Sequence, residues 1–360
     1  MTAINTELLS EFIGKIVAPD PVWLTQARTR LDNLTKPLGS LGRLEDIAAR
    51  FVAISKGDPG WPLNKAVYVL AADHGIAAEG VSAYPKEVTQ QMVFNFLREG
   101  AAINVLARMH KAELTIVDVG VDAAFGDRPG LLQRKVRSGT RNMLHEAAMT
   151  EDEMLRALRI GLELADGAHE KRQTLIAVGE MGIGNTTSAS AITAALTGRP
   201  AAAVTGKGTG IDTQAFEHKV RVVDAVIQKH LGKATLVSDP LEVLRRIGGL
   251  EIAAMVGLFL GAARYQIPVI TDGFISTAAA SLARAVEPCV CEYLFAGHCS
   301  KEPGHRFLLE YLGLEPILML EMRLGEGTGA VLAMPIIESA IRLYANMATF
   351  ASAGVSVASV

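Results

Sequence analysis

The stretch Ala66-Val67-Tyr68-Val69-Leu70-Ala71-Ala72-Asp73-His74-Gly75 decides the fold class. Its apolar part, residues 66–72, has the length of a strand buried on both faces, and a polar turn follows it. Segments of helical length separate it from further apolar runs. Those strand-length runs are residues 113–119, 174–178, 268–271 and 293–296. Alternating strands and helices predict right-handed crossovers and an α/β fold with a doubly wound, mostly parallel sheet.

Helical spacing of apolar residues predicts the remaining elements. The expected helices cover residues 6–16, 23–34, 44–54, 88–110, 151–165, 212–231, 240–265 and 330–347. Residues 1–65 contain no convincing strand. The stripe of Met92, Val93, Phe96, Ile103 and Leu106 on the helix 88–110 predicts a core or dimer-interface position for these side chains.

The composition argues against several classes of protein. A length of 360 residues is typical of two domains, or of one large domain with an appendage. Hydrophobic residues make up 49% of the chain and aromatic ones only 5%, which suits helices packed closely on a parallel sheet. The formal net charge of −3 gives no electrostatic reason to expect binding to nucleic acid or to an anionic membrane.

The location in the cell is predicted from three features. The N-terminal residues lack the basic and long apolar regions of a signal peptide. The longest apolar block, residues 252–263, is shorter than the roughly 18–20 residues needed to span a bilayer, so we expect a buried helix there. The three cysteines, Cys289, Cys291 and Cys299, are an odd number without a secretion signal. We therefore expect a cytoplasmic protein.

Polar and glycine-rich residues follow the predicted strands. They are Asp73-His74-Gly75, then Asp118 and Gly120, then Gly179-Glu180-Met181-Gly182, and then Asp272-Gly273. Ligands of doubly wound sheets bind beyond the carboxyl ends of the strands. Because polar and glycine-rich residues recur at the ends of the predicted strands, we predict a binding site at this edge of the sheet.

Residues 179–188, Gly-Glu-Met-Gly-Ile-Gly-Asn-Thr-Thr-Ser, open an alanine- and serine-rich helix. Asn185, Thr186 or Thr187 can cap this helix, and its free N–H groups suit a phosphate monoester. No glycine follows Gly184 at the offset of a dinucleotide-binding motif. We therefore predict that phosphate or ribose binds here, the alternative being a plain strand–helix turn.

A second glycine-rich loop, residues 205–212, precedes a helix but lacks the spacing of a P-loop. The N–H groups of Gly206 and Gly208 can form an anion nest, to which Lys207 or Lys219 would add charge. The alternative is a flexible surface loop.

A third segment, Arg323-Leu324-Gly325-Glu326-Gly327-Thr328-Gly329-Ala330, places one carboxylate between glycines. Glycine permits positive φ and a close approach of ligand to backbone. The segment predicts an acid, Glu326, placed against a substrate; the alternative is a solvated glutamate.

Asp73 and His74, together with His298 and His305, are the candidates for a metal site, but their spacing matches no metal-binding pattern. A structural histidine that orients a loop is the favoured interpretation. Two other functions stay open: a metal-dependent nucleotide hydrolase that uses Asp73, His74 and His298, and a non-catalytic nucleotide sensor. Because the chain lacks paired acids for Mg-pyrophosphate, any ribose phosphate is expected to arrive on a nucleotide.

Taken in order, these segments resemble the nicotinate-nucleotide:5,6-dimethylbenzimidazole phosphoribosyltransferase family, which makes α-ribazole phosphate for the lower ligand of cobalamin. One departure is Glu99, where a glycine is expected. The matching motifs cover residues 35–42, 72–75, 81–85, 179–187, 272–274, 297–298 and 323–327, so the resemblance spans nearly the whole chain.

The resemblance implies the architecture and the partners. It implies a Rossmann-like large nucleotide-binding domain over residues 66–312 and a small helical domain over 1–65 plus 313–350, with 351–360 as a frayed tail. It also implies a homodimer with the active site between the domains, substrates that are nicotinate mononucleotide and 5,6-dimethylbenzimidazole, and no cofactor.

The resemblance also implies roles for individual residues. Glu326 would be the general base, with Glu180 a secondary candidate for catalysis or for holding ribose hydroxyls. The dimethylbenzimidazole pocket would be lined by Ser82, Tyr84, Gln90 and Leu324. The phosphoribosyl half would be bound by Gly182, Asn185, Thr186, Gly206, Lys207, Gly208, Lys219 and Ser300.

This chemistry needs few groups. The leaving nicotinate departs from a pyridinium and needs no acid, whereas the incoming benzimidazole becomes cationic unless its second N–H loses its proton. One carboxylate near that N–H stabilises the charge and takes the proton. Direct displacement inverts C1′ from β to α without a covalent intermediate or a metal. An apolar pocket with one acid leaves the preferred base open among benzimidazoles, purines and phenolics.

Overall fold

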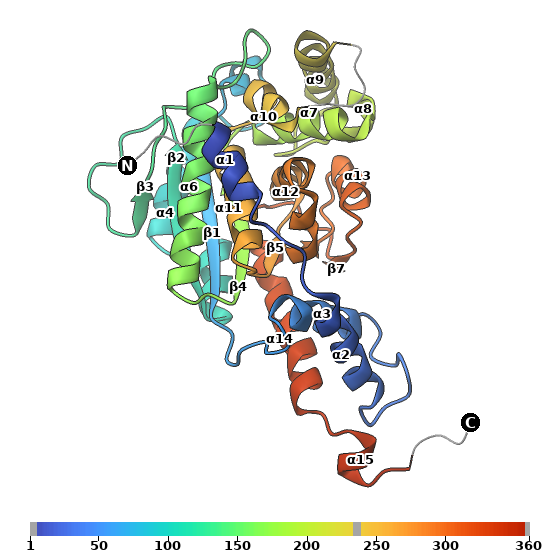
Figure 1. Ribbon diagram of the computed structural model, residues 1–360. Coiled ribbons are helices and arrows are strands. Elements are labelled where there is room, and N and C mark those ends of the chain that lie inside the picture. The colour runs from blue at the N-terminus through green and yellow to red at the C-terminus, as the bar shows by residue number, and fades with distance from the viewer. Residues whose placement is uncertain (1–5, 233–238, 357–360) are drawn as a thin grey trace.

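A parallel sheet forms the centre of the molecule in the computed structural model, which describes residues 6–232 and 239–356 (Figure 1). Its seven strands have the order β3-β2-β1-β4-β5-β6-β7, and every neighbouring pair is parallel. This confirms the predicted α/β class. The strands are β1 (Lys65–Ala72), β2 (Ala112–Gly120), β3 (Leu131–Gln133), β4 (Leu175–Met181), β5 (Val269–Thr271), β6 (Leu294–His298) and β7 (Pro316–Leu318).

The strand order reverses between β1 and β4, which are neighbours, with Ala71 opposite Met181. This is the doubly wound arrangement, in which a crevice opens where the crossovers leave in opposite directions. All five predicted strands are present. Strands β3 and β7 were not predicted. Each lies at an edge of the sheet and is only partly buried, so neither belongs to a continuous apolar run, whereas the equally short β5 is fully buried.

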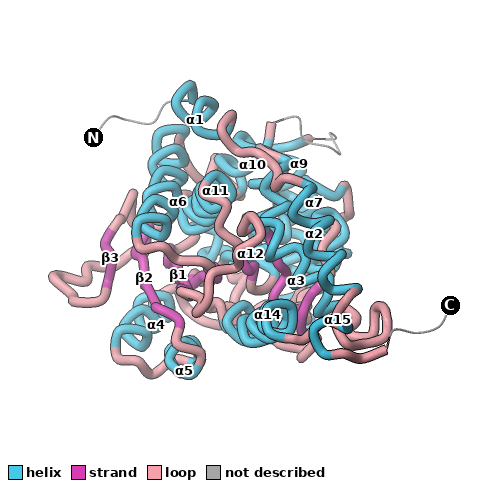
Figure 2. Tube along the Cα trace, turned by 60° about the horizontal axis from the view of Figure 1, so that its bottom comes forward, coloured by secondary structure: helices cyan, strands magenta, loops and turns pink. Residues whose placement is uncertain are grey.

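Helices cover both faces of the sheet (Figure 2). One face carries α6, α11 and α12, and the other carries α4, α5 and α14. The α-helices are α1 (Thr6–Ile13), α2 (Pro21–Asp32), α3 (Arg43–Ile54), α4 (Glu87–Leu97), α5 (Ala102–Met109), α6 (Glu151–Glu170), α7 (Asn185–Thr197), α8 (Ala201–Val204), α9 (Thr213–Leu231), α10 (Pro240–Ile247), α11 (Leu250–Arg264), α12 (Phe274–Val286), α13 (Pro303–Leu312), α14 (Thr328–Asn346) and α15 (Phe350–Ala353). Two 3₁₀ helices, η1 (Gly75–Glu79) and η2 (Pro288–Tyr293), complete the described elements.

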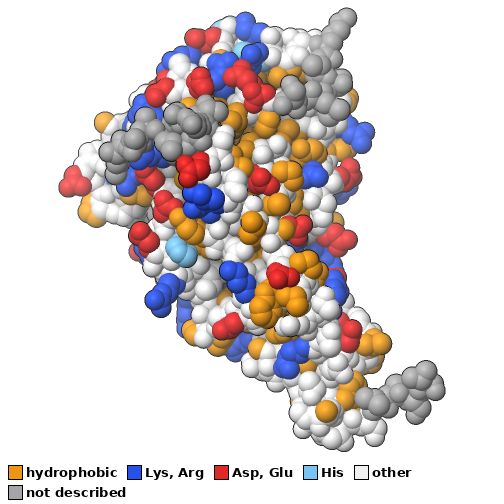
Figure 3. Space-filling view, viewed as in Figure 1, with side chains coloured by type: hydrophobic (Ala, Val, Ile, Leu, Met, Phe, Trp, Pro, Cys, Tyr) orange, Lys and Arg blue, Asp and Glu red, His pale blue; other side chains and the backbone are white. Residues whose placement is uncertain are grey.

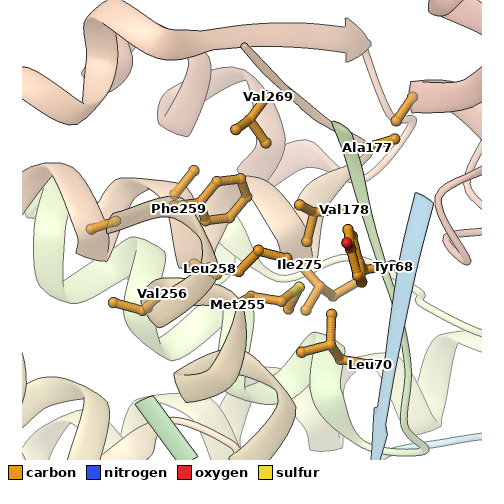
Figure 4. Packing of buried hydrophobic residues seen from close by; sticks show 14 of the residues in the cluster. Tyr68, Leu70, Ala177, Val178, Met255, Val256, Leu258, Phe259, Val269 and Ile275 are labelled. Carbon is orange, nitrogen blue, oxygen red and sulfur yellow. The ribbon is translucent and has the colours of Figure 1, made fainter. Parts of the chain in front are cut away.

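Part of the hydrophobic core lies where α11 packs on the sheet. Figure 4 shows Met255 and Phe259 of α11 among Leu70, Val178 and Val269 of the strands, and these five side chains are fully buried. The expected buried helix at 252–263 is therefore confirmed. A helix that is apolar on all sides needs protein around its whole circumference, which the sheet, α6 and α12 provide.

Glycines bring α6 and α11 together within this chain. A Cβ on Gly257 would lie 2.0 Å from the carbonyl oxygen of Leu158, and one on Gly161 would lie 1.9 Å from that of Ala254. The two backbones are therefore in direct contact, which only glycine permits. This close helix contact is thus an intrachain one.

Two helices predicted as continuous are each broken in two. The predicted helix 88–110 is α4 and α5, separated where Glu99 has φ of 60°. This left-handed residue stands where the family pattern led us to expect glycine, and it ends α4. The predicted helix 240–265 is α10 and α11, separated at Gly248 and Gly249.

Segments from the two ends of the chain lie side by side at the bottom of Figure 1. Helices α2 and α3 lie beside α14, Arg30 donates from Nε to the carbonyl oxygen of Tyr344 at 2.7 Å, and Leu34 forms a β-bridge with Thr349. The division into a large and a small helical domain stays a prediction. Of the predicted frayed tail, residues 357–360 lie outside the described residues, and its first residues belong to α15.

Helix α14 is the one helix in the described part of the chain that is long and apolar enough to cross a membrane. Half of its most apolar window is buried inside the protein, against α3, α5 and strands β4 to β7. A helix packed into a core passes the same test of length and hydropathy, so this feature alone is weak evidence for a membrane span.

Charged side chains are intermingled on the face shown in Figure 3, where lysines and arginines alternate with aspartates and glutamates. This distribution agrees with the small net charge, from which we expect no nucleic-acid partner.

Candidate active site

A cavity of about 700 Å³ lies beyond the carboxyl ends of β4, β5 and β6. This is the edge at which the sequence predicts a ligand, next to the reversal of strand order. The lining residues are Tyr84, Val88, Met92, Glu180, Met181, Gly182, Ile183, Asn185, Thr186, Gly208, Thr209, Gly273, Phe274, Ile275, His298, Ser300, Glu302, Arg323, Leu324, Gly325 and Glu326.

Glu326 is placed in the cavity wall by a strained loop. Gly325, Glu326 and Gly327 have φ of 83°, 64° and 82°, which are values that glycine tolerates and glutamate rarely adopts. Asp272, which follows β5, accepts hydrogen bonds from the N–H of Gly327 at 3.0 Å and the N–H of Ala330 at 2.9 Å. Asp272 thereby caps α14 and holds the loop that orients Glu326.

The two acids of the cavity have raised pKa values. Burial, followed by the nearby charge of Asp272, raises the pKa of Glu326 to about 7. Burial, followed by Glu251 and Asp272, raises the pKa of Glu180 to about 8. Near neutral pH, Glu326 therefore exists in both forms and suits proton transfer, while Glu180 is mostly protonated.

Gly179, inside β4, allows the Glu326 loop to lie directly on the sheet. A Cβ at this position would be 2.2 Å from the backbone nitrogen of Gly327. The neighbouring contact is equally close, because a Cβ on Gly325 would be 2.5 Å from Oε1 of Glu180. Glu326 can therefore take this position only because Gly179 and Gly325 have no side chains.

Replacing Gly179 by alanine is expected to lower the free energy of unfolding by about 1–3 kcal/mol, the usual cost of overpacking, and to reduce kcat by displacing Glu326. Urea unfolding and steady-state kinetics measure the two effects. The matched control is Gly167→Ala, also an internal glycine but in α6, where nothing lies within 4 Å of the added Cβ. We expect the control to be neutral or stabilising by up to about 1 kcal/mol. If Gly179→Ala and Gly167→Ala changed the free energy of unfolding and kcat equally, the packing argument would be wrong.

The first turn of α7 forms the polar end of the cavity. Gly184, with φ of 97°, turns the chain into this helix. Asn185 donates from its side-chain amide to the carboxylate of Glu180. Thr186 accepts a hydrogen bond at Oγ1 from Nζ of Lys219 at 2.8 Å.

Lys219 lies directly behind this lining and is only 1% exposed. Burial lowers the pKa of Lys219 to about 8, and Glu302 opposes that shift. The loop next to Lys219 is fixed by Gly208, whose N–H donates to Oε1 of Glu302 at 2.9 Å and whose carbonyl oxygen accepts from Arg323 at 2.7 Å. A cation, backbone N–H groups and hydroxyls therefore gather at this end, as an anionic phosphate requires.

The structure brings most of the predicted site residues together. Those that line the cavity are Glu326, Glu180, Tyr84, Leu324, Gly182, Asn185, Thr186, Gly208 and Ser300. Those outside the lining are Ser82, Gln90, Gly206, Lys207 and Lys219. Ser82 contacts the lining through Thr209, with 3.3 Å between their hydroxyl oxygens, while Lys207 is exposed to solvent.

Several lining residues were not predicted from the sequence. Val88 and Met92 of α4 form part of the apolar wall, so Met92, which packs against the core as expected, also has a side facing the cavity. Glu302 and Arg323 both hold Gly208, although they are about a hundred residues away along the chain. Arg323 opens a segment that the sequence already marks, but the contacts of both residues with Gly208 exist only where three loops meet.

Of the histidines weighed as metal ligands, His298 and His305 are neighbours, with ring centroids 6.2 Å apart. His74 is outside the lining, with Nε2 2.6 Å from Oε1 of Glu251. His298 lines the cavity, with Nε2 3.8 Å from Oδ1 of Asp272. Within residues 6–232 and 239–356, no group of three or more His, Cys, Asp or Glu side chains is placed to hold a metal ion.

Comparison with known proteins gives a consistent result. A phosphoribosyltransferase family model matches residues 16–355. The nicotinate-nucleotide–dimethylbenzimidazole phosphoribosyltransferase of Desulforamulus reducens is 52% identical over 350 residues, 97% of this chain and 99% of the relative. The protein of that name from Geobacter metallireducens is 53% identical over 348 residues, 97% of this chain and 98% of the relative.

Among solved structures, CobT from Thermus thermophilus superimposes with a TM-score of 0.89 at 49% identity and covers 94% of this chain and all of that protein. Sequence identity of about one half to these proteins over almost the full length, together with the family match, agrees with the motifs in the sequence and with the lining of the cavity. The chain therefore belongs to the nicotinate-nucleotide–dimethylbenzimidazole phosphoribosyltransferase family.

Proposed function

We propose that this protein transfers the phosphoribosyl group of nicotinate mononucleotide to 5,6-dimethylbenzimidazole. The products are α-ribazole 5′-phosphate and nicotinate, and the reaction belongs to the nucleotide-loop branch of cobalamin biosynthesis. The observation that carries the proposal is a single cavity that joins a buried carboxylate of raised pKa, Glu326, to a cationic, hydroxyl-rich end around Thr186 and Lys219.

The cavity has two ends with different chemistry. The apolar side chains of Tyr84, Val88, Met92 and Leu324 suit a flat aromatic base. The phosphoribosyl group would occupy the other end, where the first turn of α7 presents N–H groups and Lys219 supplies charge. C1′ of the ribose would then lie where the two ends of the cavity meet, near the two acids.

Glu326 would act as the general base. As the benzimidazole nitrogen bonds to C1′, positive charge develops on the ring, and the ionised carboxylate stabilises it and accepts the proton of the second N–H. The bond from C1′ to the pyridinium nitrogen breaks at the same time, and nicotinate departs with the electron pair. Attack opposite the leaving group inverts C1′, which accounts for an α product.

Glu180 would contribute as a neutral acid. With a pKa of about 8, it is mostly protonated near neutral pH and can donate a hydrogen bond to a ribose hydroxyl or to the reacting centre. Keeping it uncharged also limits repulsion between Glu180 and the ionised Glu326. Both roles are compatible with its place in the lining.

Activity should fall on the acid side of neutrality. A base must be ionised, so kcat/KM is expected to decrease about tenfold for each pH unit below the pKa of Glu326, about 7. A pH profile of kcat/KM measures this. A profile that is flat between pH 5 and pH 8 would argue against proton transfer to Glu326.

The test of the function is chromatography of the purified protein incubated with nicotinate mononucleotide and 5,6-dimethylbenzimidazole, with and without EDTA. We expect equal amounts of nicotinate and α-ribazole phosphate, unchanged by EDTA. Release of nicotinate or phosphate without the base, dependent on a divalent ion, would indicate the hydrolase. Nucleotide binding without turnover would indicate the sensor.

We also propose a homodimer in the cytoplasm, on the basis of the family resemblance. Size-exclusion chromatography with light scattering tests the first point. A monomer that retains full activity would contradict it.

A further inference from the structure

His305 lies behind the cavity wall, in the first turn of α13, and is fully buried. Its two ring nitrogens have different partners. Nδ1 accepts a hydrogen bond from the backbone N–H of Ser300 at 2.8 Å, and Nε2 is 2.9 Å from Oγ1 of Thr277 on α12. A backbone N–H can only donate, so Nδ1 carries no proton, and the proton of the neutral ring is on Nε2. The contacts therefore assign a single tautomer of an uncharged imidazole.

The surroundings of the ring favour this uncharged form. A proton on Nδ1 would face the N–H of Ser300 and break the hydrogen bond between them. Burial, followed by the neighbouring His298, lowers the pKa of His305 to about 3, which agrees with the geometry. His305 is therefore a fixed hydrogen-bond acceptor for the backbone of residue 300.

The hydrogen bond to His305 fixes a short turn between β6 and α13, residues 300–302. Within this turn, Oγ of Ser300 accepts from the N–H of Glu302 at 3.3 Å. The carbonyl oxygen of Glu302 in turn accepts from the N–H of His305 at 3.1 Å. The histidine thus holds the turn at both ends, through its ring at residue 300 and through its backbone at residue 302. Ser300 and Glu302 both line the cavity, so the turn forms part of the wall.

Glu302 connects this turn to the glycine-rich loop 205–212. Its Oε1 accepts from the N–H of Gly208 at 2.9 Å. Gly206 packs on the same side chain, because a Cβ there would lie 2.7 Å from Cδ of Glu302. On the other side, a Cβ on Gly208 would lie 3.0 Å from Nζ of Lys219. One carboxylate therefore joins the turn held by His305 to the loop that packs against the cationic end of the cavity.

We propose that His305 is a positioning residue for the phosphoribosyl half of the substrate: its Nδ1 holds the turn 300–302 and, through Glu302, the loop next to Lys219. This role rests on the proposed function, which places the phosphoribosyl group at this end of the cavity. The ring itself does not line the cavity, so it acts through Ser300 and Glu302. His305, first considered as a metal ligand, thereby gains a different role.

Two substitutions separate the roles of the two ring nitrogens. In His305→Asn, the side-chain oxygen takes the place of Nδ1 and can accept from Ser300. In His305→Gln, the longer side chain reaches toward Thr277 in place of Nε2, and the N–H of Ser300 loses its acceptor. Both variants lose a buried ring, so both should be less stable, which urea unfolding measures. A histidine that only fills space would affect ligand binding equally in the two variants.

The first readout is calorimetric titration with nicotinate mononucleotide. We expect His305→Gln to weaken binding by about 10- to 100-fold, the usual effect of a buried donor without a partner, and His305→Asn to weaken it far less. His169→Gln, at an exposed histidine of α6 outside the lining, is the control and should bind like the wild type. Equal losses in the two His305 variants, or no loss in either, would overturn the proposed role. A wild-type protein that binds no nucleotide would instead refute the proposed function.

The second readout is ¹⁵N NMR of the wild-type protein, which decides the matter if the variants do not fold. We expect a coupling across the hydrogen bond between the Ser300 amide nitrogen and Nδ1 of His305, with the ring proton on Nε2. Saturation with nicotinate mononucleotide should shift the Nδ1 resonance, because Ser300 lies in the cavity wall. A proton on Nδ1, an absent coupling, or a resonance that bound nucleotide does not move would overturn the role of His305.

Discussion

Replacing Glu326 by glutamine is expected to lower kcat by about 10²–10⁴-fold, the usual contribution of a general base. The amide keeps the size of the side chain but accepts no proton, so the benzimidazole must carry its full positive charge in the transition state. Equilibrium binding of nicotinate mononucleotide should change little, because the proton is transferred from the other substrate. Single-turnover release of nicotinate measures the loss.

The matched control is Glu321→Gln, an exposed acid shortly before Glu326 that also has a positive φ, of 55°. It should retain wild-type turnover. The acid limb of the pH profile should vanish in Glu326→Gln and persist in the control. Near wild-type turnover in Glu326→Gln would remove this residue from the role of base.

Replacing Lys219 by methionine is expected to weaken binding of nicotinate mononucleotide by about 10- to 100-fold. Hydrogen bonds to charged groups contribute about 1.5–3 kcal/mol, and every 1.4 kcal/mol is a factor of about ten in Kd. The wild-type protein should also bind more weakly as the pH rises through about 8, the pKa of Lys219, because the ammonium then loses its proton. Calorimetric titration at several pH values measures both effects.

Lys229→Met provides the control, since Lys229 is exposed at the far end of the same helix, α9. We expect unchanged affinity and an unchanged pH dependence in that variant. If Lys219→Met bound the nucleotide as tightly as Lys229→Met does, the cationic end of the cavity would need another explanation.

The sequence determined those features that rest on local patterns. Apolar runs such as residues 66–72 were sufficient for the five inner strands, since a strand buried on both faces must be apolar throughout. The loop around Glu326 was recognised because its flanking glycines are required by backbone geometry, and the structure gives φ of 83° and 82° at these two positions. The two edge strands, β3 and β7, and the break between α4 and α5 at Glu99 have no local sequence pattern that predicts them.

The tertiary structure decided which side chains meet. In sequence, Lys207 and Lys219 were equal candidates for the anion site; in the fold, the first is exposed and the second is buried against Thr186. Likewise, the contact between His74 and Glu251 of α11 exists only in the fold. Contacts between residues far apart in the chain have no local signature, because they arise from the packing of helices and strands. The raised pKa of Glu326 has the same origin, since burial by distant segments and the charge of Asp272 produce it.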